Sequence, residues 1–322
     1  MPTDALEDLM HQKAHAQKSR AKARRSKHHR GGVPPEPADA PVLRTAWSTR
    51  LVPHNEFMGP WERCHATLVN DARAYRATGR PQIALLGDSI TESWRGTGLC
   101  RKLGRCQGVP GVLQATLGAR WPQPTVLGIA ADHTQHLLWR LADGEEVCRK
   151  CVGTVSEVSR RLADGELSPA MASDPQLAFV VLIGTNNLGR GHTPEETVAG
   201  VVAVAGTLLN QTQGRVLLNA LLPRGDGNKR KKAAPVVGSA ADGSPVRSFS
   251  PLITKVNAGL RSWAEADAAR RVGFVDCGGP FRRGEHDVQR ELMPDSLHPN
   301  RKGHELWASC LTAALLEHFP GM

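Results

Sequence analysis

The sequence lacks any apolar stretch long enough to cross a lipid bilayer. Its longest uninterrupted apolar run, residues 177–183, has seven residues, whereas a membrane-spanning helix needs about 20. The first eight residues contain three acids and no apolar stretch, so we expect neither a secretory signal nor an acid-poor transit peptide. No internal repeat is visible, and the composition excludes a collagen, a coiled coil or a disulfide miniprotein. We therefore expect an intracellular, cytoplasmic protein.

The remaining composition is that of a globular protein. The chain has 322 residues, of which 40% are hydrophobic and 22% are charged. Soluble domains usually span about 100–200 residues, so one or two domains with a sizeable core are expected. Seven cysteines in a chain of this length do not by themselves require an oxidising compartment.

Positive charge is concentrated in two segments. Residues 1–32 hold eight basic and three acidic residues, and the run 229–232 adds four basic residues. Because the formal net charge is +10, the rest of the chain is nearly neutral. Residues 13–30 contain no acid and no apolar period, which is typical of a solvated, disordered tail. The alternative is an arm that binds nucleic acid or an anionic membrane.

The domain boundaries follow from these shifts in composition. Residues 1–39 are expected to form a basic tail that ends in a proline-rich linker at residues 34–37. The domain is expected at residues 40–322. Two insertions are expected within the domain, at residues 95–112 and 226–247. The second is rich in Gly, Ala, Ser, Pro and Lys, which predicts a mobile surface loop.

Short apolar runs alternate with helical patterns in the domain. The runs that predict buried strands are residues 83–86, 125–128, 179–183, 216–221 and 272–275. The predicted helices are residues 60–75, 132–142, 193–210, 251–270 and 301–319. Asp132 with Gln135, and Thr193 with Glu196, are spaced as helix capping boxes. The alternation predicts a three-layer α/β/α fold with a five-stranded parallel sheet, whose carboxyl edge carries the reactive groups.

The first predicted strand ends at a serine. The sequence there is Gly87-Asp88-Ser89-Ile90, which places Ser89 at the carboxyl edge, beside a helix N-terminus that favours anions. Ser89 is therefore a candidate nucleophile, with a helix cap as the alternative.

Two further segments supply polar groups at the same edge. The third strand ends in Asn186 and Asn187, whose amides can donate hydrogen bonds, with turn formation as the alternative. Near the C-terminus, His298 could take the serine proton. Asp295, three residues earlier, could orient that imidazole, with a helix-entry loop capped by Asn300 as the alternative.

Together these segments resemble the SGNH (GDSL-type) serine hydrolases. The resemblance runs from Trp61 to Phe319 and is carried by residues 87–90, 184–187 and 295–298. Residues 128–132, 136–141 and 221–225 are most similar to the catalytic subunits of intracellular platelet-activating factor acetylhydrolase. The family implies a flavodoxin-like fold, no metal or organic cofactor, and a homodimer for the most similar members.

The resemblance also implies roles for individual residues. Ser89 would be the nucleophile, His298 the general base and acid, and Asp295 its orienting partner. The oxyanion hole would comprise the N–H groups of Ser89 and Ala131 and the side chain of Asn186. Preorganised donors of this kind lower the barrier by roughly 3–4 kcal/mol each.

The sequence departs from the family pattern at Ala131, where glycine is usual. The N–H survives, but a positive φ at this position would cost alanine about 1 kcal/mol or more and could turn the donor away. This departure is the strongest sequence argument for weak activity.

The cysteines leave several alternatives open. Cys100 and Cys106 lie in the first insertion, and Cys148 and Cys151 form a Cys-x-x-Cys pair. These four could bind a structural zinc, form disulfides or remain free thiols. The other three, Cys64, Cys277 and Cys310, have apolar neighbours and are expected in the core.

Three large side chains near the motifs also have more than one interpretation. Trp94 could line an acyl pocket or pack in the core, and Trp139 is expected in the core. Arg224 could face the reactive edge, face a subunit partner or be solvated.

Two functions compete. The first is a serine esterase that hydrolyses short acyl esters, such as acetylated or lyso-phospholipids or acetylated carbohydrates, through an acyl-enzyme. The second is a catalytically impaired binding module that engages acidic partners through its basic tail.

Overall fold

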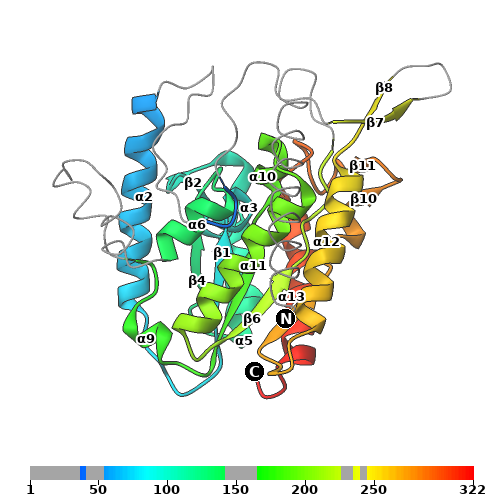
Figure 1. The fold of residues 1–322 in the computed structure, drawn as a ribbon. Coiled ribbons are helices and arrows are strands. Elements are labelled where there is room, and N and C mark those ends of the chain that lie inside the picture. The colour runs from blue at the N-terminus through cyan, green and yellow to red at the C-terminus, as the bar shows by residue number, and fades with distance from the viewer. Residues whose placement is uncertain (1–36, 41–53, 142–164, 226–234, 240–244) are drawn as a thin grey trace, which may run out of the picture. The chain divides into compact units, whose positions relative to one another are not determined.

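The central element is a five-stranded parallel sheet. In a computed structural model, the described residues are 37–40, 54–141, 165–225, 235–239 and 245–322. The strand order is β4-β1-β5-β6-β9, which is the flavodoxin-like order expected (Figure 1). The strands are β1 (Gln82–Gly87), β4 (Thr125–Gly128), β5 (Leu177–Leu182), β6 (Arg215–Asn219) and β9 (Val272–Val275). Each lies within two residues of its predicted position, because short continuous apolar runs mark strands that are buried on both faces.

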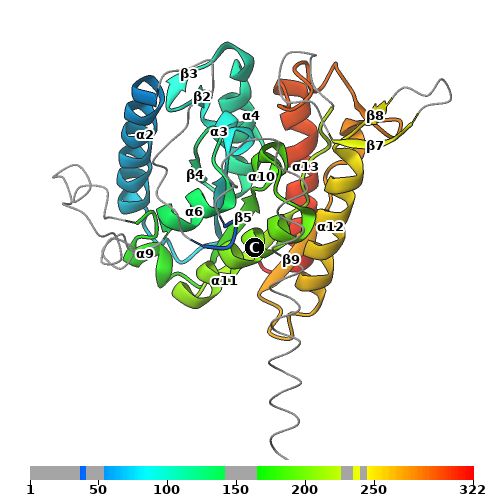
Figure 2. The same cartoon turned by 45° about the horizontal axis from the view of Figure 1, so that its top comes forward.

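Helices cover both faces of the sheet. Helix α11 packs against α6 and α12, and α13 packs against α4 and β9; Figures 1 and 2 show these as separate layers. Helix α2 runs beside the edge strand β4. Their bounds are α2 (His54–Ala74), α4 (Val109–Ala115), α5 (Leu117–Arg120), α6 (Thr134–Leu141), α11 (Pro194–Gln211), α12 (Ser250–Glu265) and α13 (Arg301–His318). The three-layer architecture is the one that the sequence predicted.

The remaining elements are short. Those at the carboxyl edge are α3 (Ser89–Glu92), η1 (Ser93–Arg95), η2 (Gly104–Cys106), α10 (Thr185–Arg190) and η3 (Gly279–Phe281). Helix α9 (Pro169–Ala172) precedes β5, and the small antiparallel pairs are β2 (Thr97–Gly98) with β3 (Arg101–Lys102), and β10 (Arg282–Arg283) with β11 (Asp287–Val288). The first insertion therefore forms the β2–β3 hairpin and η2.

The second insertion contains a two-stranded ribbon. Strands β7 (Val236–Ser239) and β8 (Pro245–Arg247) pair antiparallel and project beside α12 (Figure 1). Residues 226–234 and 240–244, which include the basic run, lie outside the described residues. A mobile surface loop was expected. Strands of three or four residues are too short to give a recognisable alternation of apolar and polar residues.

One of the two predicted capping boxes is confirmed. The Thr193 hydroxyl accepts from Glu196 N at 3.1 Å, and the Glu196 carboxylate accepts from Thr193 N at 2.8 Å. The box at Asp132 and Gln135 is wrong: helix α6 begins at Thr134, whose N–H donates to Asn187 Oδ1 at 3.0 Å. The carboxylate of Asp132 is used elsewhere, in a buried ion network.

Two strand-end glycines permit close approach of the backbone around Ser89. A Cβ on Gly87 would lie 2.1 Å from the carbonyl oxygen of Leu182, and one on Gly128 would lie 2.5 Å from Glu92 N. The Leu182 carbonyl cannot move without shifting the sheet, and Glu92 N cannot move without shifting α3. Only glycine therefore fits where β1, β4 and β5 converge beneath α3.

The predicted basic tail and its boundary at residue 39 stay predictions, because residues 1–36 lie outside the described part. Among the helices that the structure describes, none combines the length and the apolarity needed to cross a bilayer.

Candidate active site

Ser89 is the first residue of α3, directly after β1. Asp88 caps this helix, because its carboxylate accepts from Ile90 N at 2.9 Å. The Ser89 side chain is thereby free of a capping role, and its Oγ lies 2.9 Å from Nε2 of His298. The pair is separated by 209 positions along the chain. The fold thus brings the predicted nucleophile and base into direct hydrogen-bond contact.

His298 is held from its other side by Asp295. Nδ1 of His298 lies 2.6 Å from Asp295 Oδ2, and His298 N donates to Asp295 Oδ1 at 2.8 Å. Between them, Ser296 has a φ of 69°, and its carbonyl accepts from Gly225 N at 2.9 Å. The loop after β6 therefore fixes the turn that carries both residues.

Electrostatics favour a neutral imidazole beside an ionised carboxylate. Burial lowers the pKa of His298, and although the hydrogen bond to Asp295 raises it, the charge of Arg105 lowers it again, so the net shift is downward. Burial acts to raise the pKa of Asp295, but the hydrogen bond and charge of His298 outweigh it and hold that pKa below its ordinary value. This is the protonation pattern that a general base requires near neutral pH.

Asn186 and Ala131, which are expected to bind an oxyanion, follow β5 and β4, the two strands that flank β1. Asn186 Nδ2 donates to Asp88 Oδ2 at 3.2 Å and to the carbonyl of Asp132 at 2.9 Å. Ala131 adopts a φ of 65°, so the strain anticipated from the alanine is present. An oxyanion would have to compete with Asp88 and Asp132 for the amide of Asn186.

Asp88 is buried beneath this arrangement. Its pKa is raised to about 7, because the raising effects of burial and of the Asp132 charge outweigh the lowering effect of the hydrogen bond from Ile90 N. Arg224 and Arg105 lower it to a smaller extent. Its charge is thus poised to change near neutral pH, directly beside Asn186.

Asn187, the other predicted amide donor, does not face Ser89. It is buried, and its Nδ2 donates to Thr134 Oγ1 at 3.0 Å and to Gln135 Oε1 at 3.2 Å. The Asn187 side chain has a structural role, because its hydrogen bonds tie the start of α6 to the loop after β5.

A buried ion network supports the loop after β4, and sequence reasoning missed it. Arg140 Nε donates to Asp132 Oδ2 at 2.8 Å, and Arg140 Nη1 also contacts Glu166. Trp61 Nε1 donates to Asp132 Oδ1 at 2.8 Å, and His65 Nδ1 lies 2.9 Å from Glu166 Oε1. Burial would lower the pKa of Arg140, but the two acids raise it overall. Removing one member would strand a buried charge, which is strongly destabilising.

The sequence analysis also did not predict a role for Glu92. Its side chain is fully buried and accepts from Ala130 N at 2.7 Å, Cys100 N at 2.7 Å and Leu99 N at 3.0 Å. The one signal in the sequence was an acid three residues after Ser89, at a helix position that faces the core.

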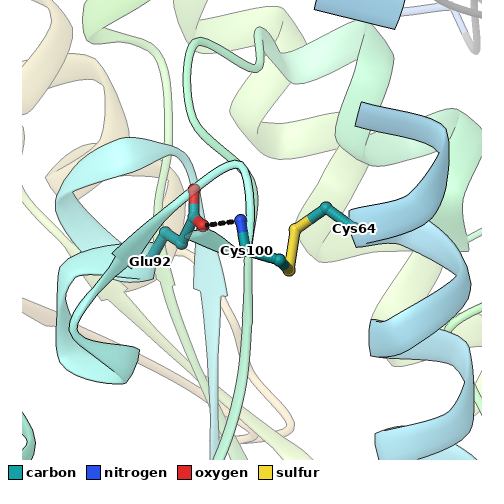
Figure 3. Close-up of side chains that lie close together, drawn as sticks. All are labelled: Cys64, Glu92 and Cys100. Carbon is teal, nitrogen blue, oxygen red and sulfur yellow. Dashed lines mark hydrogen bonds between the residues drawn. A yellow bond between two sulfur atoms is a disulfide. The ribbon is translucent and has the colours of Figure 1, made fainter. Parts of the chain in front are cut away.

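The cysteine expectations need correction. Cys64 and Cys100 form a disulfide between α2 and the first insertion, beside Glu92 (Figure 3). A second disulfide joins Cys277 and Cys310. The expected core placement is confirmed, because Cys64 and Cys277 are buried in the core and Cys310 packs against it. All three are nevertheless disulfide-bonded, since each has a cysteine within bonding reach in the fold, which sequence spacing cannot show.

The zinc alternative fails for Cys100, because a disulfide offers no thiolate ligand. Cys106 is a buried free thiol that donates to the carbonyl of Thr97 at 3.8 Å. Cys148 and Cys151 lie outside the described residues. Disulfides are rare in reducing cytosol, which counts against the expected cytoplasmic localisation.

The large side chains near the motifs also have defined positions. Trp94 and Trp139 are buried, and Trp94 contacts His304 edge to face, with ring centroids 4.5 Å apart. Trp94 therefore packs in the core and does not present an open acyl pocket. Arg224 lies at the reactive edge, where its Nη1 donates to the carbonyl of Thr185 at 2.9 Å.

A flavodoxin-like sheet with a Ser–His–Asp trio at its carboxyl edge defines a class of hydrolase folds. The model of the GDSL-like Lipase/Acylhydrolase family matches residues 85–306, which is more than half of the chain. The chain belongs to this family, as the motifs predicted, and is a hydrolase that acts on ester bonds.

Individual relatives agree with this membership. The chain is 25% identical over 265 residues to the human platelet-activating factor acetylhydrolase IB subunit alpha1, covering 80% of this chain and 84% of that protein. The bovine protein of the same name is also 25% identical over 265 residues, covering 80% of this chain and 83% of that protein.

Solved structures share the fold. A Streptococcus pneumoniae protein described as a platelet activating factor has a TM-score of 0.51 at 18% identity, covering 81% of this chain and 95% of that one. A Bacteroides fragilis protein described as an acylhydrolase has a TM-score of 0.52 at 16% identity, covering 80% and 97%.

Proposed function

We propose that the chain hydrolyses short-chain acyl esters by covalent catalysis through Ser89. The hydrogen-bonded chain from Ser89 through His298 to Asp295 carries this proposal, because it supplies nucleophile, base and orienting acid in one line. The name of the curated relatives, acetylhydrolase, supports a short acyl group. Acetylated phospholipids, lysophospholipids and acetylated carbohydrates are the candidate substrates, and the homodimer implied by the family stays a prediction.

The reaction has two halves. Ser89 Oγ attacks the ester carbonyl while His298 Nε2 accepts its proton, and the negative charge develops on the carbonyl oxygen. As the tetrahedral intermediate collapses, His298 returns the proton to the leaving alcohol and an acyl-enzyme remains. Water then attacks the acyl carbon with His298 as base, and the acid and free Ser89 are released.

Asp295 has two tasks in this cycle. It fixes the tautomer that leaves Nε2 able to accept a proton, and its negative charge stabilises the imidazolium that forms. The N–H groups of Ser89 and Ala131 and the amide of Asn186 would bind the oxyanion. Binding the oxyanion more tightly than the ground-state carbonyl is what raises turnover.

Hydrolysis of 4-nitrophenyl acetate and octanoate tests the proposal. We expect the wild type to prefer the acetate, and Ser89→Ala and His298→Ala each to lose about 10³-fold or more in kcat. Exposed Ser309 provides the matched control, because Ser309→Ala removes a hydroxyl without touching the site. A folded wild type that does not exceed the buffer rate would instead support the impaired binding module.

A further inference from the structure

Arg105 reaches the nucleophile turn from the first insertion. It belongs to η2 and is half-buried. Its Nη1 donates to Ser93 Oγ at 2.8 Å, and Ser93 Oγ donates to the carbonyl of Ser89 at 2.7 Å. The guanidinium is thus two hydrogen bonds from the backbone of the proposed nucleophile.

Arg224 reaches the same site from the loop after β6. It is half-buried, and its guanidinium lies over the ring of Phe249, 4.2 Å from the centroid. Its bond to the carbonyl of Thr185 places it beside Asn186, and its neighbour Gly225 holds Ser296. The loop that fixes the turn of Asp295 and His298 therefore also carries this positive charge.

Neither arginine forms an ion pair with a carboxylate among the described side chains. Both charges act on the carboxylate of Asp88, which accepts hydrogen bonds from Ile90 N and Asn186 instead. Partly burying a guanidinium without an acid partner is costly, and the cost is visible because burial lowers the pKa of Arg224. Both charges also act on His298, and they come from two different elements, η2 and the loop after β6.

We propose that Arg105 and Arg224 bind an anionic group of the substrate, which makes esters of carboxylated or phosphorylated alcohols the preferred class. This proposal rests on the proposed function, since a short acyl group leaves the alcohol as the part that can carry the charge. A guanidinium forms paired, charge-assisted hydrogen bonds with either a carboxylate or a phosphate. The anionic group of a bound substrate would supply the negative charge that pairs with the two guanidinium groups.

Three acetyl esters of similar size separate charge from shape. They are the neutral 4-acetoxy-3-nitrobenzamide, the carboxylated 4-acetoxy-3-nitrobenzoate and the phosphorylated 4-acetoxy-3-nitrobenzyl phosphate. Each kcat/KM is divided by the rate constant of that ester with hydroxide, which removes differences in leaving-group reactivity. We expect the wild type to favour at least one anionic ester over the amide by about tenfold, the effect of one charge-assisted bond. The anionic ester with the higher normalised kcat/KM shows whether the site prefers a carboxylate or a phosphate.

Charge-removing variants assign this preference to the arginines. Arg105→Gln and Arg224→Gln should each lower the anionic-to-neutral ratio about five- to tenfold, while Arg105→Lys should retain part of it. The ratio is measured within each variant, so a lower folded fraction does not affect it. Exposed Arg101 on β3 gives the matched control, and Arg101→Gln should keep the wild-type ratio.

The outcomes separate this inference from the proposed function. A wild type that hydrolyses the neutral ester without charge preference, or Gln variants with an unchanged ratio, would overturn the anion site alone. A folded wild type inert towards all three esters would overturn the proposed function, and the anion site with it.

Discussion

The buried carboxylate of Glu92 accepts a hydrogen bond of 2.7 Å from the backbone N–H of Ala130. This bond ties helix α3, which carries the proposed nucleophile, to the loop after β4. The same carboxylate also binds Cys100 N (Figure 3), so one side chain holds the first insertion and this loop together. Because Ala131 follows directly, Glu92 positions a residue whose N–H is proposed to bind the oxyanion.

Replacing Glu92 by glutamine should impair both stability and turnover. An amide nitrogen cannot accept a hydrogen bond, so at least one of the buried N–H groups would be orphaned at a cost of about 1–3 kcal/mol. We expect Glu92→Gln to lower kcat about tenfold or more, with KM changing little. Denaturant unfolding and ester kinetics measure the two effects, and exposed Glu265→Gln is the control. Wild-type kcat in Glu92→Gln would contradict the positioning role.

Glycine at position 131 should stabilise the protein. Ala131 has a φ of 65°, a left-handed conformation that costs a residue with a Cβ about 1–2 kcal/mol. Part of that gain is lost to the greater unfolded-state freedom of glycine, so Ala131→Gly should gain about 0.5–1 kcal/mol. We expect kcat to stay equal or rise.

The adjacent alanine provides the comparison. Ala130 does not have a positive φ, so Ala130→Gly should lower the unfolding free energy. Equal destabilisation by the two substitutions in urea unfolding would show that position 131 is not strained.

The pH profile of kcat/KM should report His298. Only the neutral imidazole accepts the Ser89 proton, and because the pKa of His298 is lowered from its ordinary 6.5, the neutral form persists to lower pH. The midpoint of the acid limb should therefore lie below 6.5. Arg105 contributes to this lowering, so Arg105→Gln should move the midpoint upward. A wild-type midpoint above 6.5, or a downward move in Arg105→Gln with the neutral ester, would contradict this account.

The Cys64–Cys100 disulfide should contribute substantially to stability. It closes a loop with a sequence separation of 36, for which chain entropy predicts roughly 3–4 kcal/mol. We expect the Cys64→Ala/Cys100→Ala double variant to unfold at lower denaturant concentration. Reductant, which also opens the Cys277–Cys310 bond, should lower the wild-type midpoint at least as far. If the double variant and the wild type unfold at the same midpoint without reductant, the bond does not hold the first insertion to α2.

Much of the fold could be predicted, because its signals are local. The buried strands are continuous apolar runs, and Ser89, Asn186 and His298 each follow a recognisable strand end or precede a helix. The resemblance to the SGNH hydrolases then placed these three residues in one predicted site.

The contacts that the sequence did not reveal are long-range pairings. The link between Arg140 and Glu166 spans residues outside the described part of the chain, and nothing local marks either residue as its partner. The pairing of Cys64 with Cys100 depends on where α2 lies against the first insertion. Asp132 matched a capping pattern, but Arg140 and Trp61 donate to its carboxylate in the core, where all three side chains are buried.

Covalent labelling by a fluorophosphonate tests the central claim most directly, because the probe reacts with a serine only when a neighbouring base activates it. Folded wild-type protein should be labelled on the peptide that contains Ser89, and Ser89→Ala should not be labelled. Labelling that persists in Ser89→Ala, or its absence from the folded wild type, would contradict the assignment of Ser89 as the nucleophile.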